Sequence, residues 1–275
     1  MRRSLIGRTW PNVVAVVLFV FFAFPVYWMI STAFKPTNDI ISKTPVFVPF
    51  NATLEHFKTA VNVPKFWTYT ANSFIVTVLA VVISLLIATL ASFAIARMRF
   101  RGRKVFVLVI MAAQMAPWEV MTIAVYLISR DNEMLNSLVP LTAFYMMMVL
   151  PFTIWTLRGF IAAVPKELEE SAMVDGCTRT QAFVKVIFPL LAPGLMSTSL
   201  FGFITAWNEF PLVLIINKTD GQTLPLWLSS FQTAFGNDWG ATMAASTLFA
   251  LPVLILFVFL QRKAVGGLTD GAVKG

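Results

Sequence analysis

Residues 74–95 read FIVTVLAVVISLLIATLASFAI and contain no charged side chain. An α-helix needs about 20 consecutive apolar residues to cross the hydrocarbon core of a bilayer. A run of this length and purity therefore predicts a transmembrane helix. The number of similar runs in the rest of the chain then decides the fold class.

The composition agrees with a chain that crosses the membrane several times. Its 275 residues are 58% hydrophobic and 12% charged, and the mean hydropathy is +0.78, which is too apolar for a water-soluble domain. Six apolar runs predict transmembrane helices at about 13–34, 74–95, 105–127, 138–157, 187–216 and 242–260. The first, fifth and sixth contain prolines, which we expect to kink them. No small-residue cleavage site follows the first run, so we expect it to be an uncleaved anchor.

The distribution of positive charge predicts an orientation. The net charge is +8, but the basic residues gather in short loops beside apolar runs, which favours the positive-inside rule over a nucleic-acid partner. Most of the 21 Lys and Arg residues lie near 2–8, 97–104, 158–185 and 262–274. We therefore expect both termini and residues 158–186 to face the cytoplasm. The loops at 36–69, 129–136 and 218–240 should face outward.

Few residues could support catalysis or metal binding. The chain has one cysteine, Cys177, and one histidine, His56, so the sequence predicts no disulfide, no metal site and no catalytic constellation. It also contains no Gly-x-x-x-x-Gly-Lys-Ser/Thr phosphate loop, so we expect no nucleotide hydrolysis by the chain itself.

The polar stretch 165–183 separates two apolar runs and reads PKELEESAMVDGCTRTQAF. Its initial proline suits the first turn of a helix, and the glutamates that follow place negative charge near the positive end of the helix dipole. Gly176 predicts the end of that helix, after which a turn and a second helix follow. We expect the first helix to present Leu168, Ala172 and Met173 to a groove on a partner. A helix that merely lies on the bilayer surface is the alternative.

Several motifs resemble those of permease subunits in ABC importers. Glu170-Ser171-Ala172, followed by Gly176 and by Ile187-Phe188-Pro189, is similar to their EAA loop, with Ser171 in place of the first alanine. Further matches to carbohydrate permeases of the maltose-transporter, MalG-like type are Trp207-Asn208-Glu209-Phe210, Thr223-Leu224-Pro225 and GLTDGAVKG at 267–275. The resemblance covers nearly the whole chain.

The resemblance implies an all-α fold of the MetI/MalG type, with six transmembrane helices and residues 1–275 in a single permease domain. Residues 158–186 would form the cytoplasmic coupling loop that docks on the ATPases, and residues 262–275 a cytoplasmic tail that reaches them. The expected coupling residues are Glu169, Glu170, Ser171, Ala172, Asp175 and Gly176. The expected tail residues are Leu268, Thr269, Gly271 and Lys274.

The resemblance also implies partners and a location. The chain would work in a bacterial or archaeal cytoplasmic membrane with a homologous permease, an ABC ATPase dimer that binds ATP and Mg²⁺, and an extracytoplasmic sugar-binding protein. The outer loop 218–240 resembles the family's loop that reaches into that binding protein. Closure of the ATPases would move the coupling loop and rock the spans about a central cavity.

Polar and aromatic side chains inside spans are candidates for the translocation pathway, because an unpaired ionisable group is costly there. Indole rings stack on sugar faces and polar groups bond the hydroxyls. The candidates are Asn72, Gln114, Trp118, Glu119, Trp207, Asn208 and Glu209, with Ser73 beside the first. An interfacial or inter-subunit ion pair for each of the two acids, and interface anchoring for the tryptophans, are the alternatives. In the maltose relative the other permease supplies most sugar contacts.

Other functions remain as alternatives. An ABC permease for a glycerophosphodiester or a polyamine is one of them, although the tail and Trp207-Asn208-Glu209-Phe210 argue against it. A secondary transporter would need an inverted repeat and embedded ion ligands, and a membrane-embedded enzyme would need a catalytic constellation. The sequence shows neither.

Overall fold

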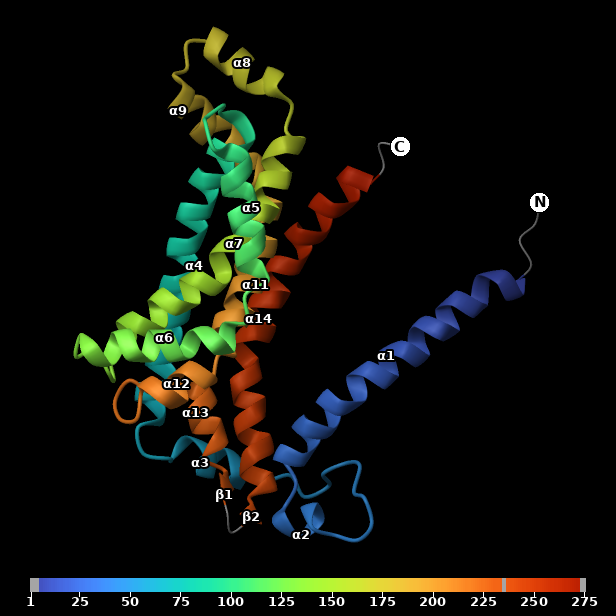
Figure 1. Ribbon diagram of the computed structural model, residues 1–275. Coiled ribbons are helices and arrows are strands. Elements are labelled where there is room, and N and C mark those ends of the chain that lie inside the picture. The colour runs from blue at the N-terminus through green and yellow to red at the C-terminus, as the bar shows by residue number, and fades with distance from the viewer. Residues whose placement is uncertain (1–4, 234–235, 273–275) are drawn as a thin grey trace. The chain divides into compact units, whose positions relative to one another are not determined.

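The computed structural model describes the backbone of residues 5–233 and 236–272, and the side chains of residues 10–232 and 236–261. The described chain is mostly helical (Figure 1). Its α-helices are α1 (Leu5–Ala33), α2 (Thr37–Ile40), α3 (Glu55–Val61), α4 (Phe66–Arg97), α5 (Arg103–Gln114), α6 (Trp118–Asp131), α7 (Leu138–Ala163), α8 (Lys166–Val174), α9 (Arg179–Ala182), α10 (Phe188–Leu190), α11 (Ala192–Trp207), α12 (Pro211–Ile216), α13 (Leu224–Ser229) and α14 (Trp239–Ala272).

Two smaller elements complete the described chain. A turn of π-helix, Phe183–Ile187, joins α9 to α10. A short antiparallel hairpin of β1 (Gln232–Thr233) and β2 (Gly236–Asn237) precedes α14, with Gln232 paired to Asn237 and Thr233 to Gly236. The chain divides into two compact units. One holds the chain up to Phe66 together with Trp227–Leu251, and the other holds Trp67–Leu226 with the remainder of α14.

Most of the predicted spans are confirmed. Within the residues that the structure describes, five stretches of helix are long and apolar enough to cross a membrane, namely Trp10–Ala33, Phe66–Arg97, Leu138–Ala163, Ala192–Ile216 and Trp239–Gln261. The predicted fifth span, 187–216, begins too early, because Ile187 still belongs to the π-helical turn. It is also broken between α11 and α12 by the residues around Glu209, and Pro211 then starts α12.

The third predicted span, 105–127, is wrong as a single straight helix. The structure forms α5 and α6 there instead, which meet at an angle of 96°. Pro117 precedes α6. A proline lacks the N–H that would continue the helical hydrogen bonds and disfavours helical geometry in the residue before it, here Ala116. The five spans become six if this bent pair is counted as one.

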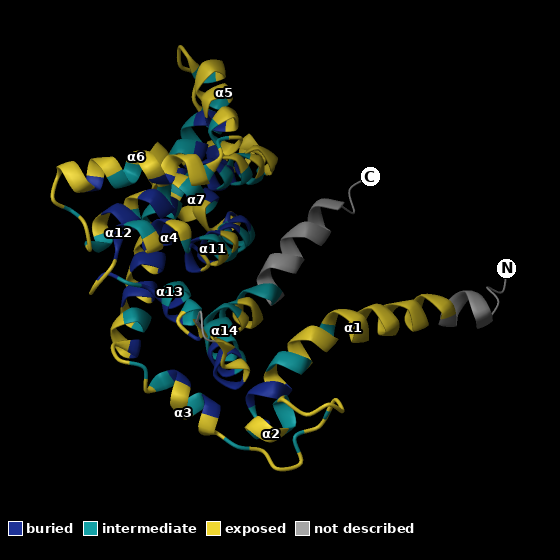
Figure 2. Ribbon diagram, turned by 60° about the horizontal axis from the view of Figure 1, so that its bottom comes forward, coloured by how far each residue is buried: buried dark blue, intermediate teal, exposed yellow. Residues whose placement is uncertain are grey.

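The second unit is held together by helices α4, α7, α11 and α12, whose facing sides are buried (Figure 2). Small residues allow the close approach of α7 and α11, since a Cβ added at Gly202 would lie 2.8 Å from Cγ1 of Val149. The Ser92 hydroxyl on α4 donates a hydrogen bond of 2.9 Å to the Ile154 carbonyl on α7. Small side chains and hydroxyls at helix contacts are typical of membrane proteins.

In the first unit, the segment that follows α1 folds back on the end of that helix. The Tyr27 and Ser31 hydroxyls donate to the Phe47 carbonyl at 2.8 and 2.9 Å. The Thr53 N–H donates to the Phe34 carbonyl at 2.8 Å. Most apolar side chains along α1 are exposed (Figure 2), as expected of a helix that faces lipid or a protein partner.

Candidate functional site

The polar stretch 165–183 forms the predicted helix, turn and second helix. Helix α8 follows Pro165 and ends before Gly176, whose φ of +89° lies in the left-handed region that glycine adopts without strain. Helix α9 then begins with a capping box. The Thr178 hydroxyl accepts from the Gln181 N–H at 3.3 Å, and the Gln181 side chain accepts from the Thr178 N–H at 2.8 Å. The Thr-x-x-Gln spacing is a sequence signal for this cap, and our sequence analysis missed it.

The α8–α9 segment, residues 166–182, lies at one end of the second unit, beyond the ends of α4 and α7 (Figure 1). Two arginines form ion pairs that hold the segment in this position. Nε of Arg97, at the end of α4, lies 3.4 Å from Oε2 of Glu169, and Nε of Arg179 lies 3.6 Å from Oε1. Arg97 also donates to the Val164 carbonyl at 2.6 Å. The side chains of Arg97 and Glu169 are only 5% and 6% exposed, so this pair is internal to the chain.

The predicted coupling residues differ in their exposure. Among the six predicted coupling residues, Glu169 and Ala172 are buried against their own chain. They share a face because residues three apart are neighbours on a helix. Leu168 and Met173 are exposed, but Ala172 is not, so the expected apolar face does not form as predicted. The exposed coupling candidates are Glu170, Ser171, Asp175 and Gly176.

A pocket of about 200 Å³ lies within the second unit, where α6, α7, α11 and α12 meet. It unites four of the predicted pathway residues, which are Trp118, Glu119, Asn208 and Glu209. The sequence analysis missed its other lining residues, which are Thr122, Phe144, Met148, Thr205 and Pro211. No sequence signal distinguishes these from ordinary helix-packing residues.

The two carboxylates of the pocket differ in their surroundings. Glu209 is buried, and its oxygens accept from the Tyr145 hydroxyl at 3.1 Å and from the Leu212 N–H at 2.8 Å. The Glu209 carboxylate therefore accepts a hydrogen bond from a backbone N–H at the start of α12. The first N–H groups of a helix have no partner within that helix. Glu119 lies in the first turn of α6 and is exposed. Within the described part of the chain its carboxylate has no hydrogen bond, so Glu119 is the acid of this pocket that is free to bind a solute.

Three of the predicted pathway residues do not line the pocket. The Asn72 amide donates to the carbonyls of Asp220 and Gln222 at 2.7 and 2.9 Å, and the adjacent Ser73 hydroxyl accepts from the Leu224 N–H at 2.8 Å. These hydrogen bonds hold the segment before α13 in place. The Asn72 amide and the Ser73 hydroxyl are therefore already engaged within the chain. Gln114 is the exposed last residue of α5.

Trp207 is the third of these residues, and it is packed inside the second unit. Its side chain is 1% exposed. The ring stacks on Phe203 at 5.3 Å between centroids and meets Phe74 edge-on at 4.9 Å. Because neighbouring rings occupy its surroundings, Trp207 packs the core of the second unit and offers no open face to a sugar.

The C-terminal tail is described only in part. Lys274 lies outside the described residues. For Leu268, Thr269 and Gly271 the structure describes the backbone alone, as the last turns of α14.

Comparison with known proteins agrees with the resemblance stated for the motifs. Residues 80–265 match the family described as "Binding-protein-dependent transport system inner membrane component". Over the full length of both chains, the sequence is 73% identical to the diacetylchitobiose uptake system permease protein DasC of Streptomyces coelicolor. It is 31% identical to the trehalose/maltose transport system permease protein MalG of Thermococcus litoralis, again over the full length of both chains.

A solved structure has the same fold. It is a chain of a bacterial ABC transporter involved in the import of the acidic polysaccharide alginate, with a TM-score of 0.78 and 22% identity, and the similarity covers 95% of this chain and 99% of that one. The helical architecture predicted from the apolar runs is thereby confirmed. By its matched residues and by its likeness to these permeases, the chain belongs to the family of binding-protein-dependent transport system inner membrane components.

Proposed function

We propose that the chain is the permease subunit of an ATP-driven, binding-protein-dependent carbohydrate importer whose solute is a neutral amino-sugar disaccharide such as N,N′-diacetylchitobiose. The observation that carries this proposal is the 73% identity, over the whole of both chains, to a permease named for diacetylchitobiose uptake. The chain itself is not the ATPase, since its sequence has no phosphate-binding loop. A partner ATPase dimer binds ATP and Mg²⁺ and hydrolyses the nucleotide.

The α8–α9 segment docks on that ATPase dimer. Its exposed residues include Glu170, Ser171 and Asp175, and these meet the partner groove. The buried Arg97–Glu169 pair joins the segment to the end of α4, so a displacement of α8 is passed to a membrane-spanning helix. Tail residues Leu268, Thr269, Gly271 and Lys274 add a second contact with the ATPases.

Residues 1–275 form one permease domain that comprises both compact units of the chain. It lies in a bacterial cytoplasmic membrane, with both termini and the coupling loop at 158–186 inside. The excess of Lys and Arg in the loops on that side supports this orientation. A homologous permease forms the other half of the pathway, and a sugar-binding protein delivers the solute from outside to the loop at 218–240.

The pocket where α6, α7, α11 and α12 meet takes part in translocation. Trp118 offers an indole surface, and Glu119 offers a carboxylate that accepts hydrogen bonds from sugar hydroxyl or acetamido groups. An exposed carboxylate in this pocket repels an anionic solute. That charge favours a neutral sugar over a glycerophosphodiester.

Uptake of a labelled sugar tests the proposal. The chain, together with its own partner permease, ATPase and binding protein, is expressed in a strain deleted for its diacetylchitobiose importer. We expect saturable uptake of N,N′-diacetylchitobiose that excess unlabelled maltose does not block. A second strain lacking only this chain is the control. Uptake of maltose or of a glycerophosphodiester, with none of diacetylchitobiose, contradicts the proposal.

A further inference from the structure

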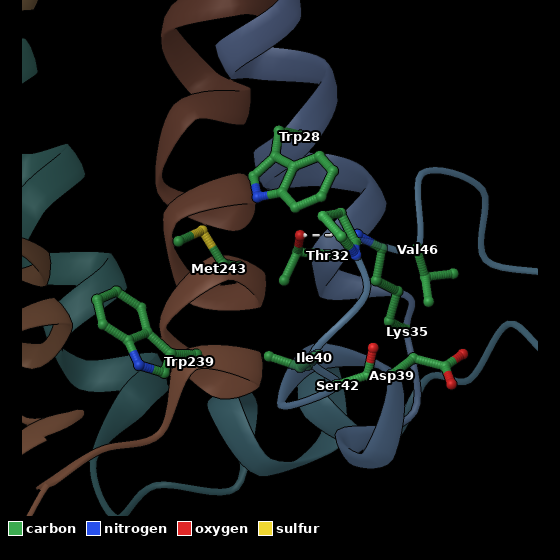
Figure 3. A pocket seen from close by; sticks show the side chains of 10 residues that line it. Trp28, Thr32, Lys35, Asp39, Ile40, Ser42, Val46, Trp239 and Met243 are labelled. Atoms are coloured by element: carbon green, nitrogen blue, oxygen red, sulfur yellow. Dashed lines mark hydrogen bonds between the residues drawn. The ribbon is translucent and has the colours of Figure 1, made fainter.

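The first unit contains a cavity of about 300 Å³ that the translocation pathway does not explain. Its walls come from the end of α1, from α2 and the segment after it, and from the first turns of α14 (Figure 3). The lining side chains include two indoles, one ammonium, one carboxylate and two hydroxyls. The residues are Trp28, Thr32, Lys35, Asp39, Ile40, Ser42, Pro45, Val46, Trp239 and Met243.

The cavity walls are fixed by hydrogen bonds of the same unit. The bonds from Tyr27 and Ser31 to the Phe47 carbonyl hold the segment that supplies Pro45 and Val46. The His56 ring is hydrogen-bonded through Nε2 to the Lys35 carbonyl at 3.0 Å. Trp28 also contacts the Phe47 ring edge-on at 5.6 Å. Such side-chain bonds hold a loop in one conformation and so pre-form a site.

The ammonium of the cavity is held in place by its neighbours. Lys35 is 2% exposed, its Nζ lies 3.8 Å from the centre of the Trp28 ring, and it donates to the Thr32 hydroxyl at 3.3 Å. Burial lowers the pKa of Lys35 below its ordinary value, while the negative charge of Asp39 acts in the opposite direction. The remaining N–H groups of Lys35 stay available as donors at the cavity wall.

Two lining groups are open to a ligand. Asp39 is half-buried, and within the described residues its carboxylate has no hydrogen-bond partner. Trp239 is 49% exposed and makes no ring contact with the described part of the chain. Figure 3 shows Trp239 on α14 and Asp39 on α2 at opposite sides of the cavity. A flat apolar ring on one side and a charged acceptor on the other match the two kinds of surface that a pyranose presents.

We propose that this cavity binds one ring of a neutral saccharide, at a site separate from the pocket lined by Trp118 and Glu119. Trp239 stacks on the apolar face of the ring, Asp39 accepts from its hydroxyls, and Lys35 donates to its oxygens. The volume lies at the low end of the range for ligand pockets, so the site holds one ring and leaves the rest of an oligosaccharide outside.

The charges of the cavity disfavour other ligands. The ammonium and the carboxylate cancel, and Asp39 repels an anion. A purely apolar ligand would remove water from both charges without compensation. A zwitterionic lipid headgroup would place its phosphate beside Asp39 as well as beside Lys35, and the Asp39 carboxylate repels that phosphate. Pairing the phosphate with the Lys35 ammonium would also displace the contacts of this ammonium with Trp28 and Thr32. A neutral polyol satisfies the open groups without displacing these contacts.

Photoaffinity labelling of the assembled importer, in nanodiscs and without its binding protein, tests the site. The probe is a diazirine derivative of N,N′-diacetylchitobiose, a choice that rests on the proposed function, with the matching maltose derivative as a second probe. Labelled peptides are located by mass spectrometry. We expect label in peptides that contain residues 28–46 or 239–243, competed by the unlabelled sugar and absent with an anionic uronic-acid disaccharide probe.

Matched variants make the result specific. Asp39→Ala should lower the affinity for the saccharide about tenfold, as loss of a hydrogen bond to a charged group predicts, whereas Glu55→Ala on α3 should not. Trp239→Leu should remove the label, whereas Trp10→Leu on α1 should keep it. These variants should leave labelling at Trp118 unchanged, which also shows that they assemble.

Three outcomes overturn the site. The first is label confined to the pocket around Trp118 and Glu119. The second is label that survives in both Asp39→Ala and Trp239→Leu. The third is label that is present in phosphatidylglycerol nanodiscs but lost in phosphatidylethanolamine nanodiscs, which identifies a lipid headgroup as the occupant. Failure of the proposed function is a separate result. It appears as absence of diacetylchitobiose uptake, and competed labelling here by the maltose probe would still support the saccharide site.

Discussion

Arg97 is the residue that most directly fixes the α8–α9 segment, because it contacts both Glu169 and the Val164 carbonyl. In Arg97→Ala, Glu169 stays buried and keeps only Arg179, whose side chain is 57% exposed. Breaking a buried pair costs about 3–5 kcal/mol, and we expect a smaller loss here because Arg179 remains. Hydrogen exchange of the α8 amides should accelerate, and less sugar should be transported per ATP hydrolysed.

Arg99→Ala is the matched control for this change, since Arg99 is an exposed arginine two residues farther along the chain. It should leave both measurements at the unmodified level. If Arg97→Ala and Arg99→Ala behave alike, the buried pair does not position the segment.

Substitution of Glu209 can distinguish a structural role of this side chain from a solute-binding role. Its hydrogen bonds to Tyr145 and Leu212 predict that Glu209→Ala lowers the thermal stability of the complex and that Tyr145→Phe lowers it less. A double-mutant cycle should give a coupling of about 1.5–3 kcal/mol, the range for hydrogen bonds to charged groups. A raised KM for uptake with unchanged stability would instead make Glu209 a sugar contact.

Gly176 determines the turn between α8 and α9. A Cβ there would meet no atom within 4 Å, so Gly176→Ala tests the left-handed backbone conformation without a steric clash. The expected cost is about 1–2 kcal/mol. If the α8–α9 segment docks on the ATPases as proposed above, ATP hydrolysis should continue while sugar uptake falls, because the two helices would no longer meet that partner at the native angle. Gly176→Asn should restore much of the uptake, since asparagine tolerates this conformation. Equal behaviour of the two variants would exclude the backbone as the cause.

Gly202 determines the distance between α7 and α11. The contact with Val149 is so close that Gly202→Leu should lower the thermal stability of the complex, and Gly202→Ala should do so to a smaller degree. Combining Gly202→Ala with Val149→Ala should recover part of the loss, because the second change makes room for the added methyl group. Additive losses in the double variant would show that these two residues do not set the helix contact.

Local sequence accounts for most elements of the fold but not for the break between α5 and α6. The run 105–127 is long and apolar enough to predict one span, and periodicity does not reveal a bend. Pro117 was the available signal, but prolines also occur inside continuous helices of this chain, such as Pro25 in α1 and Pro252 in α14. Whether a proline ends a helix depends on its neighbours in space.

The orientation of the chain in the membrane is a property of the whole molecule, and Cys177, its one cysteine, makes it testable. In a Cys177→Ser background, a cysteine is placed at Asn38 or at Asp175, both of which are exposed. A membrane-impermeant maleimide applied to intact protoplasts should label Asn38→Cys at once. It should label Asp175→Cys only after the membrane is opened. The reverse pattern would invert the positive-inside assignment.

The sequence by itself determined the membrane class, most span positions, the helix–turn–helix at 166–182 and the family. Each of these depends on local properties, namely apolar length, helix caps, a glycine at a turn and contiguous motifs. The tertiary structure decided which polar groups remain free. It pairs Glu169 with Arg97, engages Asn72 with the carbonyls of Asp220 and Gln222, and buries Trp207. It also brings Trp28 and Trp239 into one cavity. Such contacts join residues far apart in the chain, and no local pattern records them.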